Sequence, residues 1–198
     1  MELIVKRHSA FDLTLSSILV VVCPHIAFGQ NTCPLAGTVT VNFDSVAVAP
    51  DSFIDATSYL NSYGITFTPL TPSTPPIIWN GVPSGPGLSA AIPSSPPNVF
   101  FTAAPIGAAA VSYRLDFCAS LSSVSFTRTG IIGVSGDAPW TGAALNAQGQ
   151  VLDSVSEGFL IGSAAARYTL TGTGITSLQI DARNDLTRTT FNSPPLDD

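Results

Sequence analysis

The chain has 198 residues, of which 45% are hydrophobic and only 10% are charged, and its formal net charge is −6. This length suits one domain with a hydrophobic core of its own. With only seven Lys and Arg residues against this net negative charge, we expect no binding to nucleic acid or anionic lipid, because phosphate recognition needs clustered basic side chains.

Residues 1–29 have the order of a secretory signal peptide. Two basic residues precede an apolar core at 13–22, and the small-residue triplet Ala27-Phe28-Gly29 closes the segment. The apolar core is about half the ~20 residues that a membrane span requires. We therefore expect cleavage near Gln30, export to the medium or the cell surface, and no membrane span in the mature chain.

Cleavage would leave a mature chain, residues 30–198, with no histidine and no lysine, because His8, His25 and Lys6 all lie in the leader. The leader also holds two of the seven basic and two of the 13 acidic residues, so the net charge survives. A Ser-His-Asp or Cys-His arrangement, a Schiff-base lysine and an imidazole-bound metal are then unavailable. We predict no catalytic residues and no enzyme activity.

A carboxylate-dependent glycosidase remains as a remote alternative, because two carboxyl groups suffice for that chemistry. Glu157, the only glutamate of the mature chain, would have to pair with an aspartate such as Asp153 or Asp137.

Two cysteines remain in the mature chain, Cys33 and Cys118. In an exported protein an even pair indicates a disulfide, which here would close a loop of about 85 residues. Two free, buried thiols are the alternative.

The first half of the mature chain carries irregularly spaced strand signals. We expect strands at Thr38–Phe43, Gly64–Thr68 and Asn98–Thr102. A stretch rich in Pro, Gly and Ser, residues 69–97, separates the last two, and it contains a short apolar run at 77–80.

The second half shows clearer alternation. Residues 111–117 alternate with period two, which predicts a half-buried strand with Val111, Tyr113, Leu115 and Phe117 on its apolar face. Further strands are predicted around the following residues: Val124 with Phe126, Tyr168 with Leu170, Leu178 with Ile180, and a hairpin of 143–147 with 150–155. Short strands and Gly-rich turns favour an all-β fold, a single antiparallel jelly-roll or β-sandwich domain over residues 30–198.

Several of these segments together resemble a known type of domain. In order they are Val41–Ser45, Tyr59–Phe67, Asn98–Phe100, Leu121–Phe126, Asn146–Gln150, Thr171–Ser177 and Pro194–Asp198. The chain resembles the jelly-roll domains of exported bacterial proteins that often accompany a PEP-CTERM sorting tail and are related in shape to galactose-binding and carbohydrate-binding modules. The resemblance implies that a final apolar strand follows Asp198, so that residues 30–198 lack the last strand of the domain.

The same resemblance implies a structural Ca²⁺ where the first and last strands lie side by side. Asp44, Asp197 and Asp198 match those positions, and carboxylates are the hard oxygen ligands that Ca²⁺ prefers. In the alternative interpretation, Asp44 caps a turn and the two terminal acids are solvated.

Two tryptophans are candidates for ligand contact. Sugar C–H faces stack on aromatic rings, so Trp79 with Asn80 in the long loop, and Trp140 after Pro139, form the predicted ligand-binding residues. The alternative is that both rings belong to the core. The expected function is a non-catalytic extracellular binding module for glycan or a cell-surface polysaccharide, and the rival is a structural or adhesive component of an extracellular matrix or biofilm.

Overall fold

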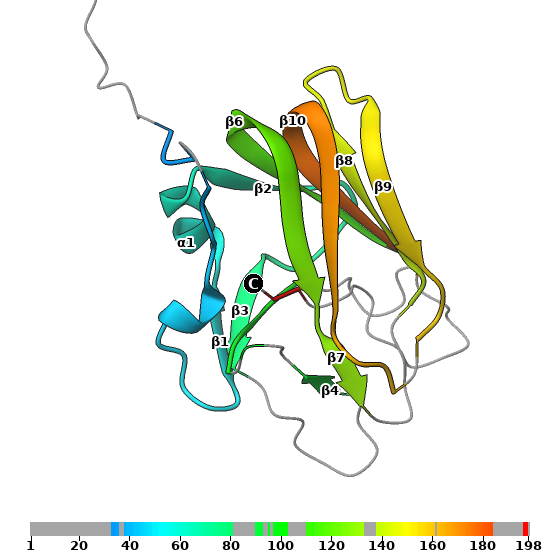
Figure 1. Ribbon diagram of the computed structural model, residues 1–198. Helices are drawn as coiled ribbons and strands as arrows, with labels where there is room; N and C mark the ends of the chain where they lie inside the picture. The colour runs from blue at the N-terminus through cyan, green and yellow to red at the C-terminus, as the bar shows by residue number, and fades with distance from the viewer. Residues whose placement is uncertain are drawn as a thin grey trace, which may run out of the picture. The chain divides into compact units, whose positions relative to one another are not determined.

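Two long antiparallel strands, β6 (Ala110–Arg128) and β10 (Ala166–Arg183), form the centre of the fold in the computed structural model (Figure 1). The structure describes residues 33–35, 38–80, 90–92, 95, 97–102, 110–132, 138–160, 162–183 and 196–197, which all belong to the compact unit Thr32–Asp198. The predicted leader lies outside these residues. Within the described ranges, the structure contains no helix with the length and apolar character needed to cross a membrane.

The ladder between β6 and β10 changes register twice, so both strands bend. The shifts lie between Thr171 and Ile175 and between Ile175 and Ser177. Gly174 has a φ of +88°, a backbone conformation that suits glycine and marks a bulge. The sequence predicted two separate strands here, around Tyr168 with Leu170 and around Leu178 with Ile180; instead β10 passes through the bulge and runs on as one strand.

One half of a continuous nine-stranded sheet combines the first part of β6 with the last part of β10. It is completed by β2 (Ile65–Pro69) on β6, β8 (Trp140–Leu145) on β10, and β9 (Val151–Glu157) on β8. The β8–β9 connection is the predicted hairpin, in which Asn146 Oδ1 accepts the backbone N–H groups of Gln148 and Gln150.

The other half of this sheet continues from the last part of β6. In spatial order it contains β11 (Leu196–Asp197), β5 (Val99–Phe101), β3 (Ile77–Asn80) and β1 (Ser52–Asp55). The remaining elements are a small sheet of β4 (Ala90–Ile92) with β7 (Gly130–Ile132), a 3-10 turn η1 (Phe43–Ser45) and the helix α1 (Thr57–Ser62). The all-β expectation is confirmed, and the architecture is a β-sandwich.

The core contains two groups of aromatic rings. Tyr113, which is 1% exposed, packs against Phe67 and Phe100 with ring centroids 5.3 and 6.1 Å apart. A second group consists of Phe126, Trp140 and Tyr168, with centroids 5.6 to 6.0 Å apart. Tyr113 and Phe126 lie on β6 and face the core as their alternation predicts.

The predicted strand at Thr38–Phe43 does not form a ladder. The expected alternation is present, since Val39 and Val41 pack on the core while Thr38 and Thr40 are exposed. No described strand forms a ladder with this segment, however, and the segment ends in η1. Alternation records which face is buried, and it leaves the hydrogen-bonding partner undetermined.

The predicted disulfide between Cys33 and Cys118 is present. It lies against the tight turn before β2, where the N–H of Cys118 donates to the carbonyl of Gly64 over 2.9 Å. Gly64 has a φ of +71°, and a Cβ there would overlap Cys118 Sγ. The bond therefore attaches the beginning of the described domain to the middle of β6.

Candidate functional site

Phe53 and Trp79 lie directly opposite each other on the neighbouring strands β1 and β3. Cross-strand partners project from the same face of a sheet, with Cβ atoms about 5 Å apart. Phe53 is 66% exposed and Trp79 is half-buried. Asp55 is two residues from Phe53 on the same strand, so its exposed carboxylate lies on that face as well. Phe53, Trp79 and Asp55 are called the aromatic face below.

The sequence predicted Trp79 as a ligand residue, but it did not predict that Phe53 lies beside it. The only sequence feature that could have indicated strand β1 is the apolar pair Phe53-Ile54 between Asp51 and Asp55, and this pair is too short to predict a strand. Asp51 has a φ of +56°, so the turn that starts β1 uses the one described non-glycine residue with a left-handed backbone.

Asn80 does not share the aromatic face. Consecutive residues of a strand project to opposite sides, so Asn80 lies behind Trp79. Its Nδ2 donates to the carbonyl of Val48 over 2.8 Å, and it thereby holds the segment before β1 in place. The structure therefore separates the two predicted ligand residues.

The expectation that Trp140 is a surface platform is wrong. The ring is only 2% exposed and packs against Phe126 and Tyr168 in the core. Its Nε1 donates to Glu157 Oε2 over 2.8 Å. Pro139 suggested a loop, but Trp140 is the first residue of β8, and Glu157 directly opposite on β9 satisfies its buried N–H.

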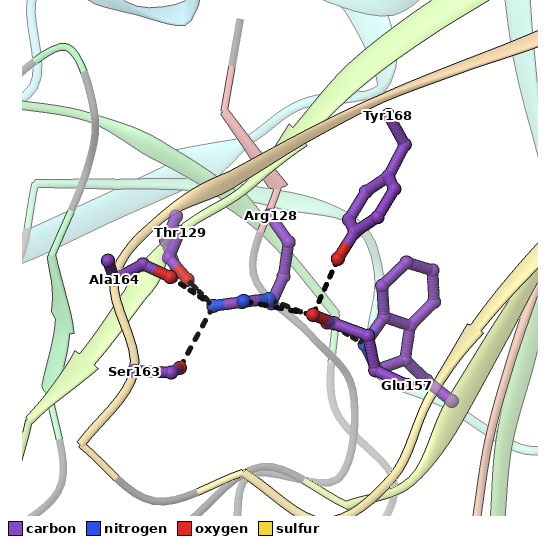
Figure 2. A network of polar contacts seen from close by, with 7 residues as sticks. Arg128, Thr129, Glu157, Ser163, Ala164 and Tyr168 are labelled. Atoms are coloured by element: carbon purple, nitrogen blue, oxygen red, sulfur yellow. Dashed lines mark hydrogen bonds and ion pairs between the residues drawn. The ribbon is translucent and has the colours of Figure 1, made fainter.

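Glu157 is the centre of a buried polar cluster that joins β6, β8, β9 and β10. The Arg128 guanidinium holds it with two contacts, Nε to Oε2 at 2.7 Å and Nη2 to Oε1 at 3.1 Å. The Tyr168 hydroxyl donates to Oε1 (Figure 2). The remaining Arg128 donor, Nη1, bonds Ser163 Oγ and the carbonyls of Thr129 and Ala164. This cluster is called the Glu157 cluster below.

Burial alone would raise the pKa of Glu157, but the hydrogen bonds from Arg128, Tyr168 and Trp140 and the charge of Arg128 outweigh it and lower the pKa below its ordinary value of 4.5. For Tyr168, burial and the hydrogen bond to Glu157 raise the pKa above its ordinary value of 10.0. The carboxylate is therefore ionised and the phenol neutral at neutral pH.

The aspartates predicted to bind calcium hold separate backbone segments. Asp44 Oδ1 accepts the N–H of Asn98 over 2.8 Å, while Asp197 accepts the N–H and the hydroxyl of Ser95 over 2.9 and 3.0 Å. Asp198 lies outside the described residues. In the described part of the chain, no three acidic, histidine or cysteine side chains gather as a metal-binding group.

Asn98 is buried beside Asp44 and joins η1 to β5. Its Nδ2 donates to the carbonyls of Phe43 and Val46, over 2.9 and 2.8 Å. Its Oδ1 is buried and has no hydrogen-bond partner among the residues that the structure describes. The Asn98 amide oxygen and the Asp44 carboxylate are both hard oxygen donors of the kind that Ca²⁺ prefers.

A groove of about 440 Å³ opens between β6 and the segment Thr38–Val41. Its deep side reaches core residues such as Phe100, Phe126 and Leu178, and its outer side carries the serines of β6. This groove could not be predicted from the sequence, because it depends on how segments distant in sequence are placed relative to each other.

Comparison with known proteins assigns no family. No family model matches the chain, and no curated protein matches it significantly. Among solved structures, an arabinose-bound α-L-arabinofuranosidase is 13% identical over 66% of this chain with a TM-score of 0.39. The enzymatically active domain of tailspike protein 4 of bacteriophage CBA120 is 14% identical over 72% of this chain with a TM-score of 0.36. The chain spans 21% and 19% of those proteins, and at this level of similarity neither supports an argument about function.

Proposed function

We propose that the protein is an exported, non-catalytic binding module that recognises a glycan or cell-surface polysaccharide through its aromatic face. The observation that carries this proposal is the cross-strand pair of Phe53 and Trp79, with Phe53 66% exposed. A large apolar ring at the edge of a sheet costs solvation free energy unless something covers it.

The chemistry of the aromatic face suits a sugar. Aromatic rings supply apolar surface of the kind that stacks on sugar C–H groups, and here two of them lie on adjacent strands. Asp55 lies on the same face and can accept hydrogen bonds from sugar hydroxyls with the lone pairs left beside its bond to the N–H of Thr57. The hydrogen bond from the Thr57 hydroxyl, together with that from the Thr57 N–H, lowers the pKa of Asp55, so the carboxylate is ionised and available as an acceptor.

Two features of the Glu157 cluster argue against the glycosidase alternative. A general acid must carry a proton, whereas the pKa of Glu157 is lowered and both of its oxygens accept hydrogen bonds. Asp153 is four residues away on the same strand, which separates the two backbones by roughly 13 Å, while catalytic carboxyl pairs are about 5 to 9.5 Å apart. Asp137 lies outside the described residues.

Substitution of Trp79 by alanine separates the platform role from a core role. If the ring stacks on sugar, Trp79→Ala reduces affinity by about 1 to 3 kcal/mol and leaves stability nearly unchanged. If the ring serves only the core, the same change lowers the free energy of unfolding by about 3 to 5 kcal/mol. Calorimetric titration with a polysaccharide that the wild type binds measures the affinity. Urea denaturation of the same sample measures the free energy of unfolding.

Val151→Ala is the matched control for the platform, because Val151 is 60% exposed on β9, at the opposite end of the strand order from β1. It should change neither affinity nor stability. An affinity loss as large as that of Trp79→Ala would place the ligand elsewhere. Phe53→Ala tests the more exposed ring and should reduce affinity without unfolding the domain. Full glycan binding by Phe53→Ala would contradict the proposal and favour the structural or adhesive role.

We further propose that Asp44 and Asn98 hold a structural Ca²⁺ ion. Binding to the native state alone stabilises a protein by mass action, so millimolar Ca²⁺ should raise the melting temperature above that measured in chelator. Asp44→Ala should abolish the increment. Identical melting curves in calcium and in chelator would contradict the Ca²⁺ site, and the role of Asp44 would then be to accept the hydrogen bond from the Asn98 N–H.

A further inference from the structure

The aromatic face carries a carboxylate beside its rings. Asp55 pairs with Ile77 in the ladder between β1 and β3, two positions along from the pair of Phe53 and Trp79. Alternate residues of a strand follow each other on one face at a spacing of about 7 Å, so Asp55 is next to Phe53 on this face and diagonal to Trp79. A ligand that covers either ring is therefore also within reach of the Asp55 carboxylate.

This carboxylate is the only charge on the part of the sheet that it belongs to. The strands β1, β3 and β5 are neighbours in the sheet, and Asp55 is the one charged residue in their sequences. Residues 30–113 contain Asp44, Asp51 and Asp55 but no lysine, arginine or histidine. The first basic residue of the predicted mature chain is Arg114, on β6.

An aromatic pair beside a carboxylate suits a cation. An ammonium group over the face of a Phe or Trp ring is attracted by the ring when it lies within about 6 Å of the ring centre. Asp55 Oδ1 accepts the N–H of Thr57 over 2.6 Å, which leaves further lone pairs of the carboxylate for an ion pair with the same ammonium group. A hexosamine with a free amino group combines an apolar C–H face with such a cation.

We propose that the aromatic face binds a glycan made of hexosamine units whose amino groups are free and protonated. This inference rests on the proposed glycan function and names the class of sugar. Sugar C–H groups stack on Phe53 and Trp79, while an ammonium group lies against the rings and pairs with Asp55. The net charge of −6 favours the approach of a polycation and opposes that of glycans with carboxylate or sulfate groups.

Three hexasaccharides with the same backbone test this class of ligand. The β-linked hexamers of glucosamine, N-acetylglucosamine and glucose differ only at the second carbon, which carries an ammonium, an acetamide or a hydroxyl group. They are titrated calorimetrically into the secreted protein at mildly acidic pH, where the sugar amines are protonated and Asp55, whose pKa is lowered by its hydrogen bonds from Thr57, stays ionised. The glucosamine hexamer should bind roughly tenfold more tightly than the other two, and added salt should weaken its binding alone.

Asp55→Asn removes the charge and keeps an oxygen that can accept the N–H of Thr57. It should lower the affinity for the glucosamine hexamer to that for the glucose hexamer and leave the affinity for the glucose hexamer unchanged. Asp116→Asn is the matched control, because it removes the same charge from β6, and it should keep the preference for glucosamine. Phe53→Ala should weaken the binding of all three hexamers, because it removes the more exposed ring.

The outcomes separate this inference from the glycan function on which it rests. Equal affinity of the wild type for the three hexamers, or a preference for glucosamine that persists in Asp55→Asn, would overturn the inference and leave the glycan function standing. A wild type that does not bind the glucosamine hexamer would also overturn it, while binding of another glycan would still support the glycan function. Unchanged binding of the glucosamine hexamer by Phe53→Ala would overturn both the inference and the role of the aromatic face.

Discussion

Replacing Glu157 by glutamine is expected to lower the free energy of unfolding by about 3 to 5 kcal/mol, because it leaves the buried guanidinium of Arg128 without its anion. The Arg128 side chain is 3% exposed, and its other partners, at Ser163, Thr129 and Ala164, are neutral. Urea denaturation of the wild type and the variant at neutral pH measures the difference.

The exposed pair of Arg114 and Asp116 provides the matched control. These side chains are 36% and 31% exposed, so Asp116→Asn removes an ion pair that water already screens. We expect a loss of about 0 to 1 kcal/mol. Equal losses in the two variants would contradict the structural importance of the Glu157 cluster.

The same variant should also change how stability depends on pH. A carboxylate whose folded pKa lies below its unfolded value contributes stability that is fully present above the unfolded value of 4.5 and is lost as the pH falls through the folded value. The wild type should therefore lose stability more steeply than Glu157→Gln below about pH 4.5. If the free energy of unfolding fell equally with pH in the wild type and in Glu157→Gln, the Glu157 carboxylate would not be the group responsible for the acid loss of stability.

Removing the disulfide is expected to cost about 4 to 5 kcal/mol, because the bond between Cys33 and Cys118 closes a loop of 85 residues in the unfolded chain. The bond also holds Leu35 against the core, where it lines the groove. The double variant Cys33→Ala/Cys118→Ala should therefore unfold at a lower urea concentration than the wild type.

Reductant supplies the control for this variant. Dithiothreitol should shift the wild-type transition toward that of the double variant and leave the double variant unchanged. A wild-type transition that does not respond to reductant would show that the disulfide contributes nothing to stability, provided that mass spectrometry confirms the bond is reduced.

The sequence predicted structure well where the signal is local. Tyr113 and Phe126 face the core because side chains alternate along β6, and the hairpin at Asn146 forms because its amide satisfies two backbone donors within four residues. The disulfide followed from compartment and cysteine number, without any geometry. The bent course of β10 could not be predicted, because a bulge at Gly174 looks like a turn in the sequence.

The candidate sites depended on contacts between distant residues, which the sequence does not specify. Trp140 is buried because Glu157 lies opposite on β9 and Tyr168 on β10 packs against its ring. Arg128 is a single charge at the end of an alternating strand, and nothing near it in the sequence reveals its buried partner. Phe53 gains its significance from Trp79, its cross-strand neighbour 26 positions later in the printed sequence.

A glycan-array screen of residues 30–198, with the wild type beside a Phe53→Ala/Trp79→Ala double variant, tests the central claim most directly. Circular dichroism and urea denaturation of both samples first establish that the variant is folded. We expect the wild type to bind a restricted set of glycans and the folded double variant to lose those signals. Binding that persists in the folded double variant, or a wild type that binds no glycan or polysaccharide, would contradict it.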